Sequence, residues 1–179
     1  MSLQEVMEKA CNWFENQLRK PHGDRGLTYL LGRGFSETTI SKFRLGFAPD
    51  GRGIFRQEML EMGVSLEQLV DCGLVKNNEH SNSPRDYFFN RVIFPISDRR
   101  GKVIAFGGRI LGEGQPKYLN SPETRLFSKG QVLYNLVDAR AASRTTGTII
   151  VVEGYTDVIA LNQSGIQHSV APLGTALTE

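Results

Sequence analysis

Residues 148–179 read TIIVVEGYTDVIALNQSGIQHSVAPLGTALTE and carry the strongest fold signal in this chain. They open with a β-branched run that ends on Glu153, and Gly154 follows at once. A short continuous apolar run predicts a buried parallel strand, and the pattern after it predicts an amphipathic helix. Ligands of open α/β sheets bind at the carboxyl ends of strands. Glu153 is therefore a candidate for acid–base or metal chemistry, with a solvated loop glutamate as the alternative.

Further motifs precede this stretch, in a fixed order. They are Arg91–Ile96 (RVIFPI), Asp98–Gly101 (DRRG), Phe106–Arg109 (FGGR), Pro116–Thr124 (PKYLNSPET), Phe127, Lys129–Gly130 and Leu133–Tyr134, with a weaker match at Gly46–Pro49. Together they resemble the RNA polymerase domain of bacterial replicative DNA primases of the DnaG type. Residues 151–178 resemble the start of the Toprim fold in the same family. The resemblance runs from about Tyr29 to the end of the chain.

The resemblance implies an α+β fold. Its N-terminal lobe is helical and mixed, and contains a basic region with a β-hairpin. The start of an α/β Toprim subdomain, with a parallel βαβ unit, follows this lobe. We expect residues 1–145 to form the N-terminal subdomain, with a helical lobe at 3–75 and the basic β region at 85–130. Residues 146–179 are then the truncated beginning of the Toprim subdomain. The chain is expected to be a fragment, because family members continue to an aspartate-containing metal motif. Their N-terminal zinc-binding and C-terminal helicase-binding domains also lie outside these residues.

The activity implied by the resemblance is that of a DNA-directed RNA polymerase, a primase. The full-length parent would join NTPs into short RNA primers on a single-stranded DNA template, with Mg²⁺ or Mn²⁺ in the intact Toprim site and zinc only in the absent N-terminal domain. Its other partner would be the replicative helicase, and its location the cytoplasm, at the nucleoid or replication fork. The fragment alone is expected to be inactive and monomeric, with an open strand edge that favours self-association.

Two other functions remain open. One is a non-catalytic module that binds single-stranded nucleic acid; Glu153 speaks against it, because a carboxylate repels phosphate unless a metal intervenes. The other is a different Toprim enzyme, such as a topoisomerase or nuclease. A topoisomerase would need a nucleophilic tyrosine in a separate domain, and the motifs between Arg91 and Thr124 resemble primases instead.

The resemblance assigns catalysis and a partial metal site to Glu153. One glutamate is an incomplete site, since Mg²⁺ usually takes one or two carboxylates and keeps several waters. Gly154, Asp157 and Gly174 would lie in loops of the active face, although Asp157 equally suits the dipole of the helix that it begins. The residues assigned to a basic groove for template or nucleotide are Lys42, Arg91, Arg109, Lys117, Tyr118 and Lys129.

Two parts of this groove also have a physical rationale. Lys117 can contact a phosphate and the adjacent Tyr118 can stack on a base, with burial in the core as the alternative for the tyrosine. Gly107 and Gly108 would clear space for a phosphate beside Arg109, or mark a kink.

Composition supports these expectations. The 179 residues carry a net charge of only +2, but residues 85–109 hold six basic side chains against two acidic ones. Such a surface suits a polyanion, although basic residues also protect strand edges. Two cysteines without Cys-x-x-Cys spacing and three scattered histidines argue against zinc in this chain. No apolar run approaches the roughly 20 residues of a membrane span.

Local patterns predict the elements. Helices are expected at residues 3–20, 28–32, 55–62, 65–72 and 130–142, with Ser65 as the cap of the fourth, and a further short helix is expected to start from a cap at Ser36. A hairpin is expected from strands at 92–96 and 103–106, with its turn at 98–101, and a βαβ unit at 148–170. Residues 76–84 are expected to form a loop and residues 144–147 a turn. Pro95 inside the first hairpin strand predicts an edge position or a bulge.

Overall fold

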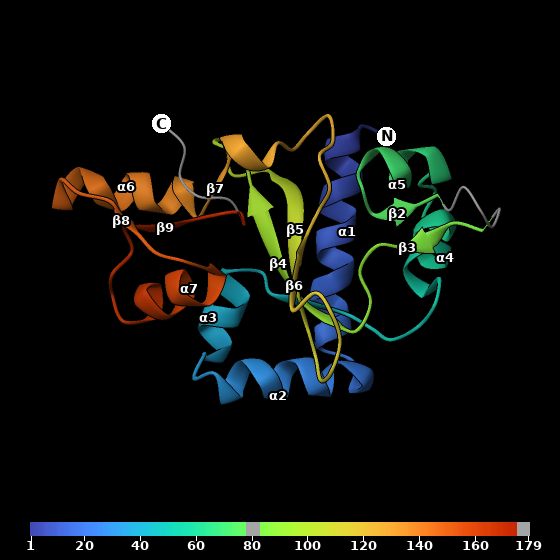
Figure 1. Cartoon of the computed structure of the whole chain (residues 1–179), viewed down its shortest axis with the longest axis horizontal. Coiled ribbons are helices and arrows are strands. Elements are labelled where there is room, and N and C mark those ends of the chain that lie inside the picture. The colour runs from blue at the N-terminus through green and yellow to red at the C-terminus, as the bar shows by residue number, and fades with distance from the viewer. Residues whose placement is uncertain (78–82, 175–179) are drawn as a thin grey trace.

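The computed structural model describes residues 1–77 and 83–174 of the chain (Figure 1). The elements in order are α1 (Leu3–Leu18), η1 (Pro21–Gly23), α2 (Asp24–Gly32), α3 (Glu37–Lys42), β1 (Gly46–Ala48), α4 (Ile54–Glu61), α5 (Leu66–Asp71), β2 (Val75–Lys76), β3 (Arg85–Asp86), β4 (Arg91–Ser97), β5 (Val103–Ile110), β6 (Tyr118–Asn120), η2 (Lys129–Gln131), β7 (Leu133–Tyr134), α6 (Leu136–Thr146), β8 (Ile150–Val151), α7 (Tyr155–Gln163) and β9 (Ser169–Pro172). The predicted α+β class is confirmed.

An antiparallel sheet with the strand order β1-β4-β5-β6 forms the centre of the molecule. Figure 1 shows α4, α5, β2 and β3 on one side of it, the unit from α6 to β9 on the other, and α2 below. The predicted β-hairpin is confirmed as β4 and β5, which are longer than expected. Strand β1 pairs with β4 and so ties the N-terminal helices to the sheet.

The position of Pro95 agrees with the edge-or-bulge prediction. Strand β1 begins opposite Ile93 and runs away from Pro95, so within the described residues β4 pairs with β5 alone at Pro95. The register shifts immediately afterwards, between Ile96 and Ser97. A residue without a backbone N–H is tolerated there because no ladder hydrogen bond is lost.

Polar caps set the helix starts in the N-terminal half. The side chain of Ser36 accepts a hydrogen bond from the Thr39 backbone N–H (3.2 Å), which confirms the predicted cap of α3. Ser65 caps α5 and forms a full capping box with Gln68. The predicted loop at 76–84 is shorter than expected, because β2 and β3 pair across it; residues 78–82 lie outside the described residues.

The C-terminal βαβ unit is confirmed, since β8 and β9 are parallel and α7 connects them. The predicted helix at 130–142 was wrong in its start: residues 129–131 form a 3₁₀ turn, and β7 pairs with β9 before α6 begins. The predicted turn at 144–147 was also wrong, because α6 continues to Thr146 and ends on Gly147, at φ 70°. Tertiary strand pairing overrides local helix propensity here.

The first strand of this unit is less buried than its sequence predicts. Strand β8 covers two residues, and its side chains Ile150 and Val151 are 37% and 48% exposed. Within the described part of the chain, β8 pairs with β9 alone, so one of its edges has no partner strand.

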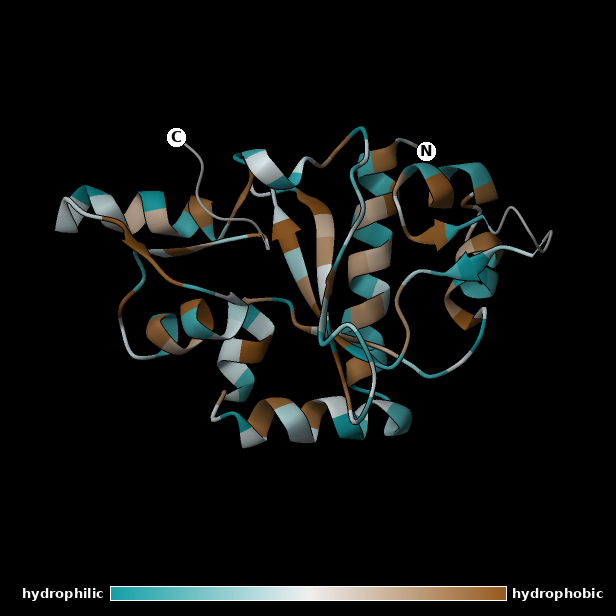
Figure 2. Ribbon diagram, viewed as in Figure 1, coloured by the Kyte–Doolittle hydropathy of each residue, from teal (hydrophilic) through white to brown (hydrophobic). Residues whose placement is uncertain are grey.

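Two apolar clusters hold the fold together. One lies between α1, α4, α5 and the sheet, and Phe14 is at its centre, stacked on Phe55 (centroids 5.2 Å) and edge-on to Phe106 (5.2 Å). The other joins α2, α3 and the sheet to α7 and β9. Apolar segments alternate with polar ones along α1, as expected of a helix with one buried side (Figure 2). No helix in residues 1–77 and 83–174 is long and apolar enough to cross a membrane.

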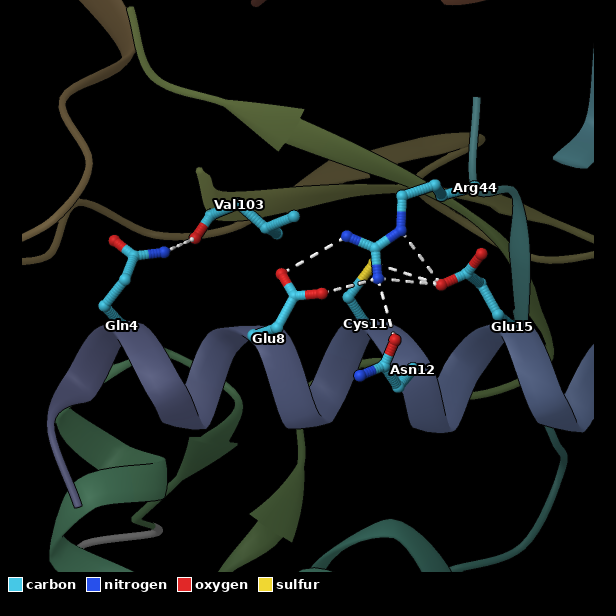
Figure 3. A network of polar contacts seen from close by, with 7 residues as sticks. All are labelled: Gln4, Glu8, Cys11, Asn12, Glu15, Arg44 and Val103. Atoms are coloured by element: carbon cyan, nitrogen blue, oxygen red, sulfur yellow. Dashed lines mark hydrogen bonds and ion pairs between the residues drawn. The ribbon is translucent and has the colours of Figure 1, made fainter. Parts of the chain in front are cut away.

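A polar stripe on α1 was not predicted (Figure 3). Arg44 has a left-handed backbone (φ 54°), and its guanidinium donates to Glu8 (2.8 Å), Asn12 (2.8 Å) and Glu15 (3.0 Å). Burial lowers the pKa of Arg44, but the two carboxylates outweigh burial and the net shift is upward. This network fixes the chain just before β1 against α1.

Candidate nucleic-acid interface and active face

A pocket of 320 Å³ lies where β6, the start of α7 and the end of β9 meet. Five of the predicted site residues line it: Tyr118, Glu153, Gly154, Asp157 and Gly174. Tyr118 belongs to β6, and the other four lie in or directly after the βαβ unit, more than 30 residues later in the sequence. The fold therefore joins the motif around Tyr118 to the motif around Glu153.

Glu153 lies in the short link from β8 to α7 and is exposed. Within the residues that the structure describes, no hydrogen bond or ion pair engages its carboxylate. Asp157 differs, because its Oδ2 accepts a hydrogen bond from the Gly154 backbone N–H (3.1 Å) at the start of α7. This contact supports the helix-end explanation of Asp157, and it leaves Glu153 as the pocket carboxylate with neither oxygen hydrogen-bonded within the described residues.

Tyr155, which sequence reasoning missed, anchors the start of α7 to the sheet. Its ring stacks on Phe94 (5.1 Å, 9° between planes) and packs edge-on against Tyr134 (4.8 Å). Its hydroxyl donates to Oδ1 of Asn120 on β6. Burial is the main reason that the pKa of Tyr155 is raised, and the nearby Tyr118 raises this pKa further. The phenol therefore positions the Glu153 loop relative to β6.

The Gly107-Gly108 pair serves this packing. A Cβ on Gly107 would lie 2.6 Å from the Tyr155 ring, and a Cβ on Gly108 would lie 2.9 Å from the side chains of Arg91 and Phe88. Protein side chains therefore approach both glycines closely, and the β4–β5 pairing continues through them without a register shift. The expectation that the glycines make room for a phosphate was wrong, because protein side chains fill that space.

The predicted basic residues near the pocket differ in exposure. Arg91 is only 3% exposed, and its Nη1 donates to the carbonyls of Gly108 (3.1 Å) and Lys117 (3.4 Å). Burial lowers the pKa of Arg91. Arg91 thus supports the backbone that presents Lys117, which is exposed just before β6. Tyr118 is 40% exposed, so the alternative of a core tyrosine does not hold.

Lys129 and Lys42 lie outside this pocket. Lys129 lines a separate cavity of 700 Å³ beside Arg99 and Leu173. The Nζ of Lys42 donates to Oδ1 of Asn162 on α7 (2.8 Å), so this lysine joins α3 to α7. The structure does not bring these two residues to Tyr118 and Glu153, and their role in binding stays a prediction.

Tyr29 of α2 and Arg33, which caps the C-terminal end of that helix, contact residues of the site, and the sequence did not predict either. Tyr29 lies under the guanidinium of Arg109, and Nη2 of Arg33 donates to Thr156 at the start of α7 (3.2 Å). Their spacing of four residues on a helix was the available signal, because such residues share a face.

The pocket contains oxygen groups of the kind that bind a divalent cation. Glu153 and Asp157 offer carboxylate oxygens, which are the ligands that Mg²⁺ prefers. The part of the chain that the structure describes contains no cluster of three or more histidine, cysteine, aspartate or glutamate side chains. The carboxylate oxygens are thus of the type that Mg²⁺ prefers, but these two side chains are too few to form a complete site.

Comparison with known families agrees with this geometry. The family described as DNA primase catalytic core, N-terminal domain, matches residues 13–140. This chain belongs to the DNA primase catalytic core family. The Toprim domain family matches residues 147–179, so the motif of Glu153 falls within the Toprim part of the primase core.

Individual primases are similar over nearly the whole chain. The DNA primase of Pseudomonas putida is 46% identical over 175 residues, which are 97% of this chain and 26% of that protein. A crystal structure of a DNA primase domain from Pseudomonas aeruginosa matches with a TM-score of 0.90 and 44% identity, over 99% of this chain and 56% of that one. A DnaG primase catalytic domain bound to single-stranded DNA matches with a TM-score of 0.88 and 41% identity, over 98% and 55% of the two chains. The chain thus spans about a quarter of the P. putida primase.

Proposed function

We propose that this chain is the part of a DNA primase that holds the single-stranded template and supplies one catalytic carboxylate. The full-length protein would join NTPs into short RNA primers for DNA replication. The pocket that joins Tyr118 to Glu153 carries this proposal, because template contact and chemistry need residues from both motifs. We assign residues 1–145 to the N-terminal subdomain of the core and residues 146–179 to the beginning of the Toprim subdomain.

The template would bind along the Lys117 side of the pocket. An exposed lysine makes a point-charge contact with phosphate, and an exposed tyrosine beside it stacks on a base of any sequence. Arg109 lies directly across from Tyr118 in the β5–β6 ladder and adds a second positive charge. The binding of single-stranded DNA by a similar catalytic domain supports this assignment.

Glu153 would serve the chemistry. Its exposed carboxylate lies in the pocket without a protein partner among the described residues, so it is free to take a proton or to hold a cation. Mg²⁺ or Mn²⁺, when bound, neutralises charge that develops on the transferred phosphate. Asp157 keeps Gly154 and the first turn of α7 in place, and this contact orients the loop that carries Glu153.

The remaining partners follow from membership in the primase family. We propose that the full-length protein works in the cytoplasm at the replication fork, with zinc and the replicative helicase bound by domains outside this chain. The chain alone would be an inactive monomer that self-associates at high concentration.

Fluorescence anisotropy with a labelled single-stranded oligonucleotide tests the interface. Lys117→Ala is expected to weaken binding about equally for all sequences and to lower the slope of log affinity against log salt by about 1. Lys102→Ala is the matched control, because Lys102 is exposed at the opposite end of β5. Equal affinity and slope for the wild type and Lys117→Ala would contradict the proposed interface.

A further inference from the structure

Arg109 forms a cluster with two tyrosines. Its Cζ lies 4.8 Å from the centroid of the Tyr29 ring, and Tyr118 is its cross-strand partner on β6. The three side chains come from α2, β5 and β6. The cluster lies at the Tyr118 side of the pocket.

The guanidinium of Arg109 is held by few polar groups. Its Nη1 donates to the Ile110 carbonyl, and no carboxylate among the described residues forms an ion pair with it. Its Nε and the Tyr29 hydroxyl are both buried, and both are without a hydrogen-bond partner in the part of the chain that the structure describes. The aromatic face of Tyr29 is therefore the main side-chain group that orients this cation.

Helix α2 gives Tyr29 a fixed position. Nη2 of Arg25 lies 3.8 Å from where a Cβ of Gly112 would be, in the loop between β5 and β6, and Arg33 bonds to Thr156 on α7. Arg25, Tyr29 and Arg33 are spaced by four residues, so one face of α2 runs along this side of the site. The bond from Arg33 to Thr156 fixes the C-terminal end of this face to α7, four residues after Tyr29.

We infer that Tyr29 is a positioning residue, whose ring holds the Arg109 guanidinium in the orientation that meets a phosphate of single-stranded DNA. The inference rests on the proposed function, since it takes single-stranded DNA as the ligand of Arg109. A cation over an aromatic face is attracted more strongly when it is partly removed from water, and Arg109 is half-buried. The inferred role belongs to the ring of Tyr29, whereas its hydroxyl is buried near Tyr118.

The alternative is that Tyr29 only packs against the neighbouring apolar cluster. Four variants separate the two roles: Tyr29→Leu removes the aromatic face, Tyr29→Phe keeps it, Arg109→Ala removes the cation, and Tyr29→Leu with Arg109→Ala removes both. Leu31→Ala, at an exposed position of the same helix, is the control. If Tyr29→Leu does not unfold cooperatively, Tyr29→Met is used in its place, because methionine keeps the apolar bulk and also lacks the aromatic ring.

The measurement is anisotropy of a labelled single-stranded oligonucleotide against salt. We expect Tyr29→Leu to weaken binding by about two- to fivefold and to lower the salt slope, with Tyr29→Phe and Leu31→Ala near the wild type. In the Arg109→Ala background, Tyr29→Leu should not weaken binding any further.

Unchanged binding by Tyr29→Leu while Arg109→Ala binds weakly would overturn the inference. Equal weakening by Tyr29→Leu with and without Arg109 would do the same and show a packing role. Unchanged binding by both Arg109→Ala and Lys117→Ala would instead refute the proposed interface itself.

Discussion

Tyr155 is the residue on which the geometry of the pocket depends most. Its ring bridges Phe94 and Tyr134, and its hydroxyl reaches Asn120, so one side chain joins β4, β6, β7 and α7. Glu153 is two residues away and has no protein partner of its own among the described residues. The position of the candidate catalytic carboxylate therefore depends on how well the Tyr155 ring fits.

Gly107→Ala tests this dependence. The added Cβ would lie 2.6 Å from the Tyr155 ring, which must shift, and overpacking of this kind costs about 1–3 kcal/mol. Gly130→Ala is the control, because nothing lies within 4 Å of the added Cβ. The free energy of unfolding in urea measures both. A Gly107→Ala variant as stable as Gly130→Ala would show that the ring is not held in this position.

At the scale of the element, β8 is an edge strand whose apolar side chains are exposed. Ile149, Ile150 and Val151 are exposed, and β9 is the one strand that pairs with β8 in the described part of the chain. An apolar edge with free backbone N–H and C=O groups is a template for pairing with a second chain. The βαβ unit thus places Glu153 at the end of an edge strand, and we propose that this edge promotes self-association.

Val151→Lys is expected to reduce that self-association, because a charged side chain on an edge strand opposes pairing. In sedimentation velocity, the average mass of the wild type should rise with concentration, and that of Val151→Lys should rise less. Val137→Lys makes the same change at an exposed position on α6 and should behave as the wild type. If both lysine variants reduce association equally, net charge and not the edge of β8 is responsible.

At the scale of the whole molecule, local patterns predicted the features that depend on neighbouring residues. The Ser36 and Ser65 caps, the β4–β5 hairpin and the βαβ unit follow from capping chemistry, turn residues and apolar periodicity. The resemblance assigned Tyr118 to the basic groove and Glu153 to the active face, and the structure shows that both line one pocket.

The features that were missed depend on contacts between distant segments. Strand β7 exists because it pairs with β9, and no local signal distinguishes it from the start of a helix. Arg91 was predicted as a groove residue, but its guanidinium is buried against the carbonyls of Gly108 and Lys117. Tyr29 enters the site only because α2 lies beside β5, which the periodicity of α2 alone does not show.

The central claim is that Glu153 carries chemistry in a primase core. Primer synthesis from labelled NTPs on single-stranded DNA, by the full-length protein that contains this chain, tests it most directly. Glu153→Gln keeps the size of the side chain and removes its charge, so we predict a loss of activity of at least about 100-fold with an unchanged melting temperature. Glu113→Gln, at an exposed position in the loop between β5 and β6, should retain full activity. Primer synthesis by Glu153→Gln at close to the wild-type rate would contradict the account.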